Sequence, residues 1–228
     1  MDPIEFWSER MQEHCLFLLI GLTNGAQRMD VLQKYEDEPS VQKMIYKAKT
    51  VNILKEEANN TIDLWNEYQF YPTDEKLSEA MHKTRKLKEE VYDILADGVW
   101  IGFNFLALVD HMIKELVFFQ SHIDDSLTPE DEIKFWKKHN TEDCSLFAHL
   151  MDPSEVGFTD AFLDTHSEGK KLKARILEVI DYTQKVIDTS EEMETERASN
   201  IIYPILALHE RKEQDYCLKR LNQLLEFD

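Results

Sequence analysis

Apolar side chains recur every three or four residues along most of the chain, and this spacing predicts amphipathic helices. Asp2, Thr128 and Asp152 each precede a proline, which pairs a capping oxygen with a residue that needs no amide partner in the first helical turn. Pro39 and Pro72 mark two further breaks. Helices are predicted over residues 4–22, 40–70, 75–97, 99–123, 129–150, 154–189 and 195–225, and no segment alternates as a strand does. The sequence therefore predicts an all-α fold.

Two groups of motifs occur twice, in the same order along the chain. Phe6-Trp7 followed by Glu13-His14-Cys15 reappears, with the same spacing, as Phe135-Trp136 followed by Glu142-Asp143-Cys144. Further on, residues 107–115 and 205–213 share the pattern His-x-x-Lys-Glu. Such repetition predicts a duplicated helical unit. We expect two sequence-related halves, residues 1–127 and 128–228, which pack face to face as one compact bundle with extra flanking helices.

Carboxylates and imidazoles fall on otherwise apolar helix faces. Side chains four residues apart share one face of a helix, so His111 points the same way as Glu115, and His209 the same way as Glu213. Glu13 and Glu142 lie on similar apolar lines. Four helices therefore each direct a carboxylate inward, and two of them add an imidazole.

Buried carboxylates need a positive counter-charge, because an uncompensated buried charge costs several kcal/mol. We expect no matching set of buried Lys or Arg side chains, so two divalent metal ions would supply the charge. Mixed oxygen and nitrogen ligands suit iron or manganese, with zinc as an alternative. The alternative is a polar layer in the core whose members bond to one another without a metal.

These motifs resemble the ferritin-like superfamily and, more closely, an uncharacterised bacterial family known as domain of unknown function 2935. The resemblance rests on the Phe-Trp and Glu-His-Cys segments and on Asp110-His111-x-x-Lys114-Glu115 with its counterpart at 209–213. It implies a ferritin-like helical bundle around an internal metal centre. The chain departs from the usual ferritin motif, because it reads His-x-x-x-Glu where ferritins have Glu-x-x-His.

The resulting hypothesis is a dinuclear iron or manganese centre. Its ligands would be Glu13, His111, Glu115, Glu142, His209 and Glu213. Glu13 and Glu142 would be terminal ligands, Glu115 and Glu213 would bridge the metals, and each His would cap one metal. His14 is an additional candidate ligand, and no role is assigned to Asp143 or His149. His139 is expected to be exposed.

Composition limits the partners of the protein. The 228 residues include 45 Asp and Glu against 26 Lys and Arg, giving a net charge of −19, which argues against binding to nucleic acid. The cysteines at positions 15, 144 and 217 form no close pairs, as is usual in a reducing compartment, and they are expected to be small core residues. The longest apolar run, residues 16–22, is too short to span a bilayer, and no basic leader segment precedes it. We therefore expect a cytoplasmic protein without a membrane partner, as a monomer or homodimer.

Two functions fit these observations. The first is a ferritin-like metal protein with oxidoreductase chemistry on dioxygen or peroxide and an undetermined small-molecule substrate, because the cluster lacks the extra base of a metal hydrolase. The second is a metal-free helical scaffold or binding protein that keeps a vestigial site. The acidic segment Glu89-Glu90-x-x-Asp93 is expected to be an exposed charged face.

Overall fold

The computed structural model of the chain describes residues 2–22, 37, 39–99, 101–102, 104–150 and 204–225, together with residues 174, 177, 180, 181 and 184. These residues form helices, with one isolated β-bridge between Leu22 and Gly102, which confirms the predicted all-α class. The chain divides into two units, Met1–Asp125 and Ser126–Asp228. The ferritin-like arrangement of two halves stays a prediction.

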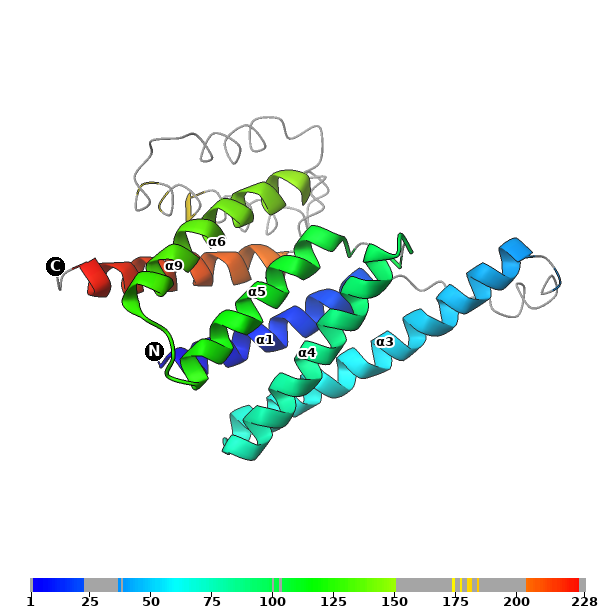
Figure 1. Cartoon of the computed structure of the whole chain (residues 1–228), viewed down its shortest axis with the longest axis horizontal. Helices are drawn as coiled ribbons and strands as arrows, with labels where there is room; N and C mark the ends of the chain where they lie inside the picture. The colour runs from blue at the N-terminus through cyan, green and yellow to red at the C-terminus, as the bar shows by residue number, and fades with distance from the viewer. Residues whose placement is uncertain are drawn as a thin grey trace, which may run out of the picture. The chain divides into compact units, whose positions relative to one another are not determined.

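The described part of the first unit contains α1 (Pro3–Gly21), α3 (Pro39–Phe70), α4 (Asp74–Ala96) and α5 (Leu106–Ile123). Helix α1 packs against α3, α4 and α5, α3 packs against α4, and α4 packs against α5, so the four helices form a bundle (Figure 1). Large side chains from all four helices are fully buried in this bundle: Trp7, Met11, Leu18, Leu54, Trp65, Leu87 and Phe119.

Local chemistry sets the starts of two of these helices. The Asp2 carboxylate accepts a hydrogen bond from the amide of Ile4 at 3.3 Å and so caps α1. The Thr73 hydroxyl caps α4 by accepting from the amide of Lys76, also at 3.3 Å. Both helices begin within a residue of the predicted positions.

The predicted helix over 99–123 is wrong in its first turns, because α5 begins only at Leu106. Helix α4 ends before Gly98, whose φ of +72° lies in the left-handed region that favours glycine. Gly102 then pairs with Leu22, and the Asn104 side-chain amide donates to the carbonyl of Leu18 at 3.0 Å. These contacts with the end of α1 hold the connection in a non-helical conformation.

The described part of the second unit contains α6 (Pro129–Leu150) and α9 (Pro204–Leu225), which pack against each other. Trp136 of α6 and Cys217 of α9 are fully buried. Arg220 donates through Nε and Nη2 to the two carboxylate oxygens of Glu132, each at 2.8 Å, and so ties the two helices together. The predicted helix over 154–189 lies outside the described residues except for five isolated helical positions, as do residues 195–203 of the last predicted helix.

None of the described helices combines the length and the apolar character that are needed to cross a membrane.

Candidate metal site

In the first unit, one buried carboxylate lies between two imidazole rings. Oε2 of Glu115 on α5 is 3.0 Å from Nε2 of His14 on α1, and Oε1 is 3.5 Å from Nε2 of His111, one helical turn earlier on α5. All three side chains are buried. The structure therefore brings together the predicted pair His111 and Glu115 with the additional candidate His14.

The electrostatics of this group keep Glu115 ionised. Burial raises the pKa of the Glu115 carboxyl, but the charges and hydrogen bonds of His14 and His111 outweigh burial and hold the pKa well below its ordinary value. A carboxylate is thus present where a positive charge or a metal ion would be stabilised.

The first unit also contains buried cations, so the expectation that no Lys or Arg accompanies the buried acids is wrong. Lys88 of α4 is 0% exposed, and its Nζ lies 2.8 Å from Nδ1 of His14. Arg10 of α1 is also fully buried and donates through Nη2 to Glu13 at 2.9 Å. The Lys88 ammonium also approaches Sδ of Met11 at 3.5 Å, and the Arg10 guanidinium lies over the ring of Phe6, 5.2 Å from its centroid.

Glu13 and Glu142, the two predicted terminal ligands, are partly exposed in the structure. The Glu13 side chain is 18% exposed and forms its ion pair with Arg10. The Glu142 side chain is 24% exposed, and its Oε1 lies 3.6 Å from Nζ of Lys138. Their role as metal ligands stays a prediction.

The second unit also places a carboxylate between two imidazole rings. Oε1 of Glu213 lies 3.1 Å from Nε2 of His209, one turn earlier on α9, and Oε2 lies 3.2 Å from Nε2 of His139 on α6. The same nitrogen of His139 is 3.6 Å from Oδ2 of Asp143. Four buried side chains from two helices, two imidazoles and two carboxylates, therefore converge.

The expectation that His139 is exposed is wrong, because its side chain is only 2% exposed. His139 lies three residues after Trp136 and four before Asp143, so all three share the face of α6 that packs against α9. Its ring stacks on Phe135, with centroids 4.9 Å apart and an interplanar angle of 20°. The helical spacing from Trp136 is the signal that could have identified His139 from the sequence.

Gln214 organises the polar groups beside this cluster, a role that the sequence did not reveal. Its side-chain amide nitrogen donates to Asp143 at 2.8 Å and to Glu210 at 2.6 Å. Its amide oxygen accepts from Nδ2 of Asn140 at 2.9 Å. All four side chains are buried, so Gln214 fixes the orientation of Asp143 relative to His139.

The two cysteines described by the structure are core residues, as predicted. Burial raises the pKa of the Cys15 thiol to about 11. Burial also raises the pKa of Cys217, and the negative charges of Asp143 and Glu210 raise it further. Neither thiol is therefore poised to ionise near neutral pH.

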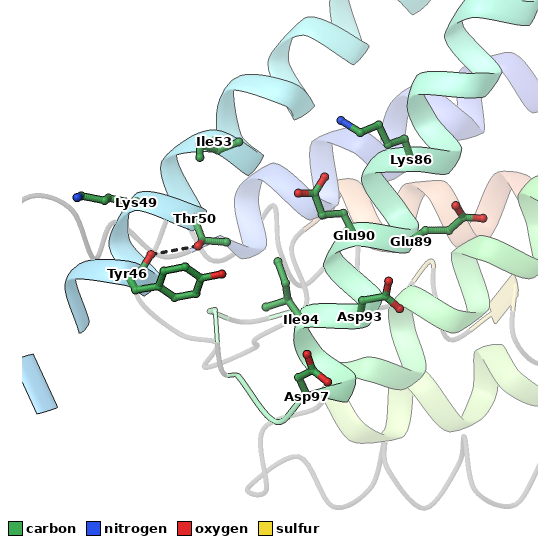
Figure 2. A pocket seen from close by; sticks show the side chains of 10 residues that line it. All are labelled: Tyr46, Lys49, Thr50, Ile53, Lys86, Glu89, Glu90, Asp93, Ile94 and Asp97. Atoms are coloured by element: carbon green, nitrogen blue, oxygen red, sulfur yellow. Dashed lines mark hydrogen bonds between the residues drawn. The ribbon is translucent and has the colours of Figure 1, made fainter. Parts of the chain in front are cut away.

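A separate cavity of about 740 Å³ lies between α3 and α4 (Figure 2). Glu89, Glu90 and Asp93 line it from α4, opposite Tyr46 and Ile53 of α3. Glu89 and Asp93 are exposed, which agrees with the predicted charged face, while Glu90 is half-buried. Burial and the neighbouring charge of Glu57 raise the pKa of Glu90.

Fold and site together define an all-helical protein in which buried His/Glu groups could hold a metal ion. No model of a known protein family matches the sequence. The chain is 24% identical over 259 residues to an uncharacterised protein of Acanthamoeba polyphaga mimivirus, an alignment that covers 98% of this chain and 80% of the viral protein. The crystal structure of an uncharacterised protein from Bacillus cereus is similar in fold, with a TM-score of 0.63, 14% identity, and coverage of 97% of this chain and 89% of that one.

Proposed function

We propose that this protein binds a transition metal ion through its buried histidine and glutamate side chains. The observation that carries the proposal is that, in each unit, a buried carboxylate contacts the Nε2 atoms of two imidazoles: Glu115 with His14 and His111, and Glu213 with His139 and His209. Two histidines and one carboxylate form a donor set that suits non-haem iron, and mixed oxygen and nitrogen ligands also suit manganese. Zinc is the third candidate.

The chemistry of the donor set supports a fit with a metal ion. The four contacts between imidazole nitrogens and glutamate oxygens measure 3.0 to 3.5 Å. In the second unit Asp143 adds a further carboxylate oxygen beside His139. An iron or manganese ion held there would supply oxidoreductase chemistry with dioxygen or peroxide. The resemblance of the sequence motifs to ferritin-like proteins supports a dinuclear centre.

A metal-free polar layer is the second candidate, and one observation favours it in the first unit. Lys88 and Arg10 place buried positive charges beside His14 and Glu13, which offsets carboxylate charge without a metal. Under this alternative the His/Glu groups specify packing, and the protein acts as a scaffold.

Metal analysis of the full chain tests the proposal. The protein would be reconstituted separately with Fe²⁺, Mn²⁺ and Zn²⁺, passed through a desalting column, and measured by mass spectrometry of the bound metal. We expect at least one equivalent per chain, and Glu213→Gln should lose metal. Asp215→Asn is the matched control, because Asp215 is an exposed carboxylate two residues away on α9. Less than one equivalent with all three metals would contradict the proposal and leave the metal-free scaffold.

A further inference from the structure

Lys88 is an ammonium group buried directly behind one of the candidate metal-binding histidines. Besides the 2.8 Å contact with Nδ1 of His14, its Nζ lies 2.6 Å from the carbonyl oxygen of Met112 and 3.5 Å from Sδ of Met11. A carbonyl and a thioether can only accept hydrogen bonds, so Lys88 is the donor in both contacts. These three contacts match the three N–H groups of an ammonium.

A charged Lys88 favours one arrangement of the protons on His14. With Lys88 donating, Nδ1 of His14 is the acceptor, and the ring proton then sits on Nε2. Nε2 faces Oε2 of Glu115 at a distance of 3.0 Å. If the shared proton sits instead on Nδ1, the ring is an imidazolium and Nε2 is still protonated. In both arrangements of a protonated Lys88–His14 pair, the nitrogen that faces Glu115 carries a proton.

A metal-binding histidine needs the opposite polarity. The metal binds a bare ring nitrogen, and the other nitrogen normally donates its N–H to a carboxylate or a carbonyl. At Nδ1 of His14 the roles are reversed, because Lys88 donates to the nitrogen that would itself donate in a metal-binding histidine. The contact with Lys88 therefore favours His14 as a hydrogen-bond donor to Glu115 over His14 as a ligand.

The imidazoles of the second unit are surrounded by negative charge, whereas His14 of the first unit contacts the Lys88 ammonium. His139 faces the carboxylates of both Glu213 and Asp143, and Glu210 is held close by through Gln214. Burial, and then the negative charges of Asp143 and Glu210, also raise the pKa of the neighbouring Cys217 thiol. A divalent cation is stabilised in such surroundings.

We propose that Lys88 is a positioning residue that makes the two His/Glu groups unequal, so that a metal ion fills the group of the second unit first. The inference rests on the proposed function for its metal. Lys88 holds His14 as a donor to Glu115, and the group of the first unit binds metal more weakly for as long as Lys88 is present.

A calorimetric titration of the metal-free full chain with Mn²⁺ alone tests which of the two His/Glu groups binds the metal first. We expect a tight first step that Glu213→Gln abolishes and that Glu115→Gln leaves in place. Lys88→Met removes the donor but keeps a long apolar side chain, and it should tighten binding to the first unit by at least about tenfold, the scale of effects for groups that orient metal ligands. Loss of the tight step in Glu115→Gln but not in Glu213→Gln would overturn the proposal, as would unchanged binding in Lys88→Met.

A measurement on the metal-free wild-type chain gives a second readout and does not depend on how any variant folds. Long-range ¹H–¹⁵N correlation spectra separate protonated from bare ring nitrogens of histidine, and we expect His14 to show a protonated Nε2. A bare Nε2 on His14 would overturn the role of Lys88. If His14 shows the expected protonation and no Mn²⁺ binds, the proposed function fails while the positioning of His14 by Lys88 stands.

Discussion

Nε2 of His139 lies 3.2 Å from Oε2 of Glu213, although 74 residues separate them in the sequence. Glu213 holds its second contact, with His209, within its own helix. Its carboxylate is therefore shared between α6 and α9, and the group forms only when these two helices pack. Metal binding and packing of α6 against α9 should accordingly depend on each other.

Replacement of His139 tests whether this shared contact belongs to a metal site. His139→Ala removes one imidazole from the group around Glu213, and we expect the affinity for Mn²⁺ to fall at least about tenfold. Equilibrium dialysis against the metal measures the change. Lys137→Ala is the control, because Lys137 is an exposed residue of the same helix and its loss should leave the affinity unchanged. Equal affinities for the two variants would exclude His139 as a ligand.

Gln214 should stabilise the second unit through the three hydrogen bonds of its side chain. Gln214→Leu preserves the approximate size but removes the bonds to Asp143, Glu210 and Asn140, all of which are buried. We expect the free energy of unfolding of the metal-free protein to fall by at least about 2 kcal/mol, because buried polar groups lose their partners.

Urea denaturation followed by circular dichroism measures this loss. Gln42→Leu makes the same chemical change at an exposed position of α3 and should stay within about 0.5 kcal/mol of the wild type. A loss in Gln214→Leu no larger than in the control would show that the Gln214 network does not stabilise the fold.

The helices and one part of the candidate site could be predicted from the sequence, because both depend on local spacing. Proline and capping residues located the starts of α1 and α6, and the four-residue spacing located His111 with Glu115 and His209 with Glu213. These relationships exist within one helix, so no knowledge of the packing was needed.

The parts that were missed depend on contacts between helices. Lys88 lies on the buried face of α4 together with Thr84 and Val91, where it contacts His14 of α1. A charged residue is normally assigned to the exposed face of a helix, so the sequence did not predict its burial. The start of α5 was placed too early because Gly102 pairs with Leu22, a contact with a distant segment that residue spacing does not reveal. Long-range pairing overrode local helix propensity there.

Glu115 should make stability depend on pH in a defined direction. Its pKa in the folded protein lies well below the ordinary 4.5, despite burial, because of His14 and His111. The contribution of the Glu115 carboxylate to the free energy of unfolding is therefore fully present above pH 4.5, the pKa of the unfolded state. It is lost as the pH falls through the lower pKa of the folded state. Glu115→Gln removes the charge at every pH.

We therefore expect the difference in unfolding free energy between wild type and Glu115→Gln to be largest near pH 7, about 3 kcal/mol. The difference should shrink as the pH is lowered below about 4.5, the unfolded pKa of Glu. Denaturation at a series of pH values measures it, with the exposed Glu56→Gln of α3 as the control. A difference that grows in acid would show that the Glu115 carboxylate does not stabilise the fold.

The hydroxyl of Thr84 joins α3 to α4 inside the first unit. Its Oγ accepts from Nε1 of Trp65 at 2.8 Å and donates to the carbonyl of Ala80, also at 2.8 Å, and all of these groups are buried. Thr84→Val keeps the shape of the side chain but leaves the indole N–H without this acceptor, so we expect a loss of about 1–3 kcal/mol. Thr84→Ser keeps the hydroxyl and loses a methyl group, and it should cost about 1 kcal/mol. Thermal unfolding followed by tryptophan fluorescence measures the stability of both variants. If Thr84→Ser is less stable than Thr84→Val, then Thr84 stabilises the fold through packing of its methyl group and not through the bond to Trp65.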